Sequence, residues 1–178
     1  MYMPWLFPMD IIIVQSGDTF NQKSTGPFPA PAATSQQEED TMKQYKVGII
    51  GATGMVGQRF VTLMENHPWF RLTALAASAR SAGKPYEEAV AGRWALDVPM
   101  PEEAKGIVVM DAEADAEKLA SMVDFCFCAV DMKKEEIRAL EEKYAKLECP
   151  IVSNNSAHRW TDDVPMVVPE INADHIAI

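Results

Sequence analysis

The chain has 178 residues, of which 48% are hydrophobic and 24% are charged, so it has enough apolar material for the core of a globular protein. Its net charge of −10 argues against a nucleic-acid partner and against an anionic membrane surface. No apolar run reaches the roughly 18 residues that a membrane-spanning helix needs. Three cysteines are too few for a secreted disulfide framework, and we expect a cytoplasmic location.

Residues 1–41 differ in composition from the rest of the chain. They are rich in proline, serine, glutamine and acidic residues without hydrophobic periodicity, which is typical of disorder. Lys23 is the only basic residue among them, which argues against a secretory signal and against a transit peptide. We expect a disordered or artefactual leader over residues 1–41 and a folded domain over residues 42–178.

Strand and helix patterns alternate from residue 43 onward. Short apolar segments predict strands over 45–50, 70–77, 107–110, 124–130, 150–153 and 166–168. Helical spacing predicts helices over 55–66, 114–122 and 133–147, whereas residues 78–105 are expected to be irregular. This alternation predicts an α/β fold, a Rossmann-type doubly wound parallel sheet with helices on both faces.

A glycine-rich turn follows the first predicted strand of this domain. Residues 51–57 read Gly-Ala-Thr-Gly-Met-Val-Gly and lead into the first predicted helix. We expect Gly51 to allow the tight turn, Gly54 to let the backbone approach a pyrophosphate, and Gly57 to let the helix pack against the strand. The N–H groups at the start of the helix then face the anion. This context favours dinucleotide binding over a turn that needs glycine for packing alone.

The end of the second predicted strand bears on the choice of dinucleotide. NAD sites place an Asp or Glu there, which binds the ribose 2′-hydroxyl. Residues 76–81 contain no acid, and instead they offer the guanidinium of Arg80 and the hydroxyls of Ser78 and Ser81 to a 2′-phosphate. The sequence therefore favours NADP, although a solvated loop arginine would leave the same pattern.

The same glycine spacing also occurs in short-chain dehydrogenases, whose chemistry needs a tyrosine with a lysine four residues later. Tyr45, Tyr86 and Tyr144 all lack that lysine. This class of oxidoreductase is therefore disfavoured.

Three segments together resemble one enzyme family. They are the run KVGIIGATGMVGQRF, the later ALAASARSAGKPY and the final IVSNNSAHRWTDDVPMVVPEIN. In this order they are similar to aspartate-semialdehyde dehydrogenase of the archaeal and fungal type, over about residues 42–178. The family reduces aspartyl phosphate to aspartate semialdehyde with NADPH, in the biosynthesis of lysine, threonine and methionine. The resemblance implies that residues 42–178 are an NAD(P)-binding domain.

The resemblance also implies roles for the matching positions. The phosphates of the cofactor would contact Thr53, Gly54, Met55, Val56 and Gly57. The 2′-phosphate would contact Arg80 and Ser81, and the phosphate of the substrate would lie near Asn155 and Arg159. For Arg159, a surface ion pair with Asp162 or Asp163 is the alternative interpretation.

The chain departs from the family in one respect. The cysteine nucleophile of the family, its base histidine and its substrate-binding side chains lie in segments beyond the position that matches Ile178. We therefore expect no catalytic residue in this chain and no dehydrogenase activity from this chain alone. The family usually dimerises through its second domain, so a homo-oligomer is expected for the longer protein.

The cysteines of this chain offer no substitute nucleophile. Cys126 and Cys128 lie two residues apart in an apolar predicted strand, where burial raises the pKa of a thiol, and Glu148 would raise the pKa of Cys149. The cysteines and histidines show no metal-ligand spacing, so no metal site is expected. A further group of acidic residues is interpreted as a solvated helix face: Glu135, Glu136, Glu141 and Glu142.

Three hypotheses of different classes remain. The first is the cofactor-binding part of an aspartate-semialdehyde dehydrogenase, with aspartyl phosphate as its small-molecule substrate. The second is a related acyl-phosphate reductase such as N-acetyl-glutamyl-phosphate reductase, although the segment SARSAGKPY favours the first. The third is a module that binds NADP without catalysis. A downstream reading frame with an Asn-Cys segment and a second domain would exclude the third.

Overall fold

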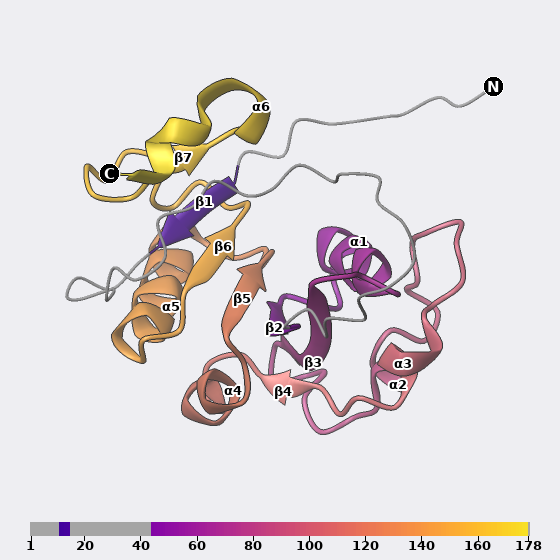
Figure 1. The fold of residues 1–178 in the computed structure, drawn as a ribbon. Helices are drawn as coiled ribbons and strands as arrows, with labels where there is room; N and C mark the ends of the chain where they lie inside the picture. The colour runs from indigo at the N-terminus through magenta and orange to yellow at the C-terminus, as the bar shows by residue number, and fades with distance from the viewer. Residues whose placement is uncertain (1–10, 15–43, 178) are drawn as a thin grey trace, which may run out of the picture.

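The computed structural model describes residues 11–14 and 44–177, which form a seven-stranded sheet flanked by helices (Figure 1). The strands are β1 (Ile11–Val14), β2 (Tyr45–Ile50), β3 (Phe70–Ala77), β4 (Met110–Asp111), β5 (Phe125–Cys128), β6 (Ile151–Ser153) and β7 (Met166–Val167). Across the sheet their order is β4-β3-β2-β5-β6-β1-β7.

The five strands from β4 to β6 are parallel to one another. Numbered in chain order from β2, they are arranged 3-2-1-4-5, which is the strand order of a Rossmann-type sheet. The prediction of an α/β fold with a parallel sheet is therefore confirmed. The strand order reverses between β2 and β5, and ligands of such sheets bind outside the carboxyl ends of the strands at that point.

Helices cover both faces of the sheet. The helices of the described residues are α1 (Met55–Met64), α2 (Tyr86–Ala89), α3 (Glu102–Lys105), α4 (Ala116–Met122), α5 (Lys134–Lys146), α6 (Pro169–Asn172) and the 3-10 helix η1 (Ala173–Ala177). Of these, α6 and η1 bury no residue. One buried cluster packs Val61 of α1 with Leu75 of β3, and the other packs Leu119 of α4 and Tyr144 of α5 with Ala76 of β3. Leu75 and Ala76 belong to different clusters because successive residues of a strand point to opposite faces.

The irregular segment and the ends of some elements differ from the prediction. The helix predicted over residues 55–66 ends at Met64, and the strand predicted over 107–110 is found later and shorter, as β4 over Met110–Asp111. The segment 78–105 contains the short helices α2 and α3, whose N-caps are Pro85 and Pro101. Proline suits the start of a helix because its φ is fixed near the helical value, so these prolines begin helices rather than interrupt structure. The helices α6 and η1 were not predicted from the sequence.

Part of the expected leader is ordered. Ile11–Val14 form β1, which pairs antiparallel with β6 and with β7, contrary to the expectation of disorder for these four residues. The physical reason is that the outer edge of β6 offers backbone donors and acceptors that a further extended segment can satisfy. The remainder of residues 1–41, including Lys23, lies outside the described residues. Among the described residues, we find no helix with the length and apolar character needed to cross a bilayer.

Candidate functional site

The turn between β2 and α1 contains two glycines that the fold itself requires. Gly51 has a φ of 87°, and a Cβ on it would lie 2.4 Å from the carbonyl oxygen of Ala129. A Cβ on Gly57 would lie 2.2 Å from the carbonyl oxygen of Gly51. These are the tight turn and the close helix packing that the sequence predicted for the two positions.

Gly54 differs from the other two because the fold leaves open space beside it. A Cβ there would meet only the carbonyl oxygen of Gly51, at an ordinary 3.5 Å, and Gly54 is exposed. It is the N-cap of α1, and no side chain caps this helix. The N–H groups of Thr53, Met55 and Val56 find no acceptor among the described residues. An open helix start with free donors fits a phosphate group.

A cleft of about 880 Å³ opens beside this turn, at the carboxyl edge of the sheet. The chain segments that follow β2, β3 and β5 line it, so it lies where the strand order reverses. Five of the residues predicted to bind the cofactor line this cleft: Gly51, Thr53, Gly54, Ser78 and Arg80. Arg80 is exposed, and its guanidinium makes no hydrogen bond or ion pair with any described residue.

Four of the predicted residues do not line the cleft. Met55 is exposed and Val56 is half-buried in the first turn of α1, and Gly57 is buried by its packing against the turn. Ser81 is also buried, and its N–H donates to the carbonyl oxygen of Ser78 at 2.8 Å. The hydroxyl of Ser81 is therefore much less accessible to a ligand than the exposed side chain of Ser78.

The cleft also contains charged residues that were not predicted to bind the cofactor. Arg93 and Lys143 line it, and each donates to a backbone carbonyl oxygen, that of Ala89 and that of Glu113. The acidic lining residues are Asp111, Glu113, Asp131 and Glu136. Arg93 lies in the segment predicted to be irregular, where no local pattern distinguishes a cleft residue from a surface residue.

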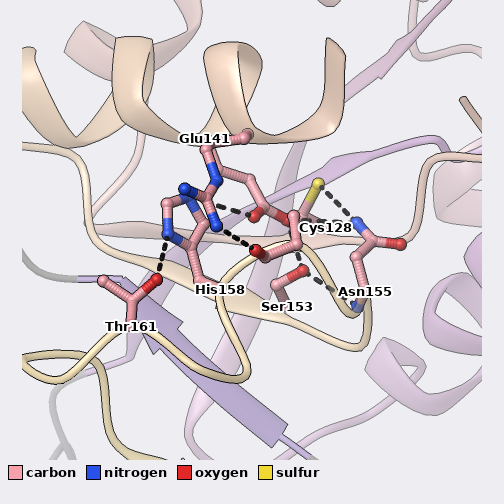
Figure 2. Close-up of polar contacts among 8 residues, drawn as sticks. Cys128, Glu141, Ser153, Asn155, His158 and Thr161 are labelled. Carbon is pink, nitrogen blue, oxygen red and sulfur yellow. Dashed lines mark hydrogen bonds and ion pairs between the residues drawn. The ribbon is translucent and has the colours of Figure 1, made fainter. Parts of the chain in front are cut away.

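The loop after β6 carries the two residues predicted to lie near a substrate phosphate. Figure 2 shows Asn155 beside Glu141, a carboxylate of α5 that is only 1% exposed. The side-chain amide of Asn155 donates to Glu141 Oε1 at 3.1 Å and to the sulfur of Cys128 at 3.5 Å. The hydroxyl of Ser153 donates to the same carboxylate oxygen. Asn155 is thus held by buried groups, and neither it nor the half-buried Arg159 lines the cleft.

Glu141 overturns part of the interpretation of the acidic residues of this helix. The other three are exposed as expected, but Glu141 faces the loop after β6. His158 Nε2 lies 3.9 Å from Glu141 Oε2, and His158 Nδ1 is hydrogen-bonded to the hydroxyl of Thr161 at 3.2 Å (Figure 2). Arg138, one turn earlier on α5, donates to the carbonyl oxygen of Ala157 at 2.8 Å. Helix α5 therefore fixes the shape of residues 154–159.

The three cysteines are free and buried. The hydrogen bond with Cys149 and burial raise the pKa of Cys126, and burial raises the pKa of Cys128. The pKa of Cys149 is instead lowered by its hydrogen bond with Cys126, against the effect of burial, so the rise expected from Glu148 is not found. Cys149 also precedes β6, at the amino-terminal edge of the sheet and away from the cleft. None of the three is the exposed, activated thiol that a nucleophile requires.

No group of histidine, cysteine, aspartate and glutamate within the described ranges could hold a metal ion. The site consists of two parts at the carboxyl edge of the sheet. One is the cleft, with the N–H donors at the start of α1 and the guanidinium of Arg80. The other is the loop after β6, which is anchored on the buried carboxylate of Glu141.

Known proteins share this architecture. The family model "Semialdehyde dehydrogenase, NAD binding domain" matches residues 46–178. Aspartate-semialdehyde dehydrogenases of Archaeoglobus fulgidus and Methanothermobacter thermautotrophicus are 42% and 44% identical to this chain, covering 76% and 73% of it but 37% and 35% of their own lengths. The crystal structure of aspartate semialdehyde dehydrogenase with NADP from Candida albicans matches with a TM-score of 0.69 and 37% identity, covering 76% of this chain and 36% of that one.

This chain thus spans about a third of the length of these relatives. The matched region contains the parallel sheet, the glycine-rich turn, the cleft and the loop anchored by Glu141. From this match, the chain belongs to the family of semialdehyde dehydrogenase NAD-binding domains.

Proposed function

We propose that this chain is the NADP-binding part of an aspartate-semialdehyde dehydrogenase. The observation that carries the proposal is the presence, on one cleft, of the open start of α1 and the guanidinium of Arg80. Arg80 follows β3, where an NAD site would have a carboxylate. The Candida albicans relative, whose crystal structure was solved with NADP, supports the same choice of cofactor.

The described residues fit the phosphates of this cofactor. The N–H groups of Thr53, Met55 and Val56 would bind the pyrophosphate, which approaches closely because Gly54 has no side chain. Arg80 and the hydroxyl of Ser78 would bind the 2′-phosphate by charge-assisted hydrogen bonds. Ser81 would act only through the turn that presents Arg80. The bound cofactor supplies a hydride for the reduction of an acyl group.

The second half of the proposal concerns the substrate. Asn155 and Arg159 would hold the phosphate of an acyl phosphate, aspartyl phosphate, in the longer protein. Their loop follows the carboxyl end of β6, the edge at which open α/β sheets bind ligands. Four relatives that match at 40–44% identity are aspartate-semialdehyde dehydrogenases, which favours this substrate over N-acetyl-glutamyl phosphate and over a module without catalysis. The three free thiols agree with a reducing compartment such as the cytoplasm.

The cofactor assignment is tested by titrating the chain with NADPH and with NADH and following the fluorescence of the reduced cofactor. We expect NADPH to bind one to two decades more tightly, because a charge-assisted hydrogen bond contributes roughly 1.5–3 kcal/mol. Arg80→Ala should remove most of this preference. Arg71→Ala is the matched control, because Arg71 is an exposed arginine of β3 that does not line the cleft. Equal affinities in the unmodified chain, or an unchanged preference in Arg80→Ala, would contradict the assignment.

A further inference from the structure

Gln58 is a buried amide that the proposed contacts to the cofactor do not use. It lies in the first turn of α1 and is only 1% exposed. Its Nε2 donates to the carbonyl oxygen of Thr53 at 3.1 Å and to that of Arg93 at 2.9 Å. Its Oε1 accepts from the N–H of Ala95 at 2.8 Å. One side chain thus joins the glycine-rich turn to a second segment of the cleft wall, entirely through backbone atoms.

A second buried side chain orients the same turn. The hydroxyl of Tyr86 donates to the carbonyl oxygen of Ala52 at 2.8 Å, and burial raises the pKa of Tyr86, so the hydroxyl remains a donor. The C=O and N–H of one planar peptide point in opposite directions. Because the Ala52 carbonyl faces Tyr86, the N–H of Thr53 points away from Tyr86. No described residue accepts a hydrogen bond from this N–H.

Gln58 completes this orientation at the next peptide. The carbonyl oxygen of Thr53 carries a partial negative charge, and an anion bound at the start of α1 would be repelled if this oxygen faced it. The amide of Gln58 binds that oxygen within the fold, at 3.1 Å. The same amide holds the backbone on both sides of Trp94, and so fixes the segment from which Arg93 lines the cleft.

We propose that Gln58 is a positioning residue for the dinucleotide: it keeps the Thr53 carbonyl turned away from the pyrophosphate and holds residues 93–95 against the turn. This inference rests on the proposed function, since it concerns the same cleft. Gln58 acts through the backbone rather than by contact with the cofactor. Preorganised donors bind more tightly because the ligand does not have to order them.

The test compares two ligands on the same variants of the full 178-residue chain. NADPH has the pyrophosphate, whereas adenosine 2′-monophosphate has the 2′-phosphate and adenosine but no pyrophosphate. In Gln58→Met, which keeps the size of the side chain and removes its amide, we expect the Kd for NADPH to rise about tenfold and the Kd for adenosine 2′-monophosphate to stay within about twofold.

Thr62→Val is the matched control on the same helix. Thr62 donates to the carbonyl oxygen of Arg59 at 2.8 Å, so this variant removes a side-chain hydrogen bond of α1 that does not reach the turn. In Thr62→Val the Kd for NADPH and the Kd for adenosine 2′-monophosphate should both be unchanged. If Gln58→Met fails to fold by circular dichroism, Gln58→Leu is compared in the same way, and the same split between the two ligands is expected.

Three results would overturn the inference. An unchanged Kd for NADPH would show that the amide does not position the turn. An equal loss of both ligands, in a variant that is folded, would show general damage to the domain instead of an effect on the pyrophosphate. An unmodified chain that binds neither ligand would overturn the proposed function itself, and this outcome is distinct because it precedes any comparison of variants.

Discussion

Glu141→Ala tests how strongly α5 holds the loop after β6. The carboxylate is 1% exposed and accepts hydrogen bonds from Ser153 and Asn155, with His158 Nε2 at 3.9 Å. A hydrogen bond to a charged group contributes roughly 1.5–3 kcal/mol, and removing the acceptor leaves the buried hydroxyl of Ser153 without the oxygen to which it donates. We expect Glu141→Ala to lower the free energy of unfolding by roughly 3–5 kcal/mol, a large part of the roughly 5–15 kcal/mol that stabilises a domain.

The measurement is urea denaturation followed by circular dichroism. Glu141→Gln keeps the size of the side chain and one carbonyl acceptor, so its loss should be smaller, roughly 1–3 kcal/mol. Glu142→Ala changes the adjacent, exposed carboxylate and should stay within about 0.5 kcal/mol of the unmodified chain. If Glu141→Ala is no more destabilising than Glu142→Ala, the carboxylate does not hold the loop and the reasoning is refuted.

Three further predictions concern packing, pH and chemistry. Gly57→Ala should lower the free energy of unfolding by roughly 1–3 kcal/mol, because its Cβ would lie 2.2 Å from the Gly51 carbonyl oxygen, whereas Gly106→Ala adds a Cβ in open space and should not; equal Tm values would contradict this. Above about pH 10 the free energy of unfolding should fall by up to roughly 1.4 kcal/mol per pH unit for each buried tyrosine, because burial raises the pKa of Tyr86 and Tyr144 and the unfolded chain loses these protons first. A free energy of unfolding that stays level from about pH 9 to 11 would contradict this prediction. When the chain alone is mixed with aspartate semialdehyde, phosphate and NADP, the absorbance of the reduced cofactor should not rise, because the thiols of the chain are buried. Any turnover would refute this prediction, and turnover that survives Cys149→Ser would exclude Cys149 as the nucleophile.

The sequence predicted β2 and β3 with the bounds that the structure has. Most of their positions are apolar, as expected for strands covered on both faces. The strand predicted over 124–130 is shorter, Phe125–Cys128, because an apolar pattern does not show where pairing with the neighbouring strands ends. Glu141 was misassigned because the pattern of a helix does not show which loop packs against it, and Glu142 beside it is exposed. The role of Gln58 was missed for a similar reason, since two of its three partners are backbone atoms 35 and 37 positions away. Ile11–Val14 pair with segments still more distant in the chain. They were predicted to be disordered because the residues around them have the composition of a disordered segment.

The position of β1 in the sheet has a consequence for how the chain reaches its final form. Ile12 pairs with Ser153 and Ile11 with Val167, about 140 and 160 residues later, so these ladders have a far higher contact order than those of the parallel sheet. A ribosome adds roughly 5–20 residues per second, so β1 waits on the order of 10–30 s for its partners to be synthesised. During that interval Ile11–Val14 lack the strands with which they pair, and an extended segment with unpaired backbone groups can pair with another chain instead. Self-association should therefore compete with folding most strongly just before this last pairing forms.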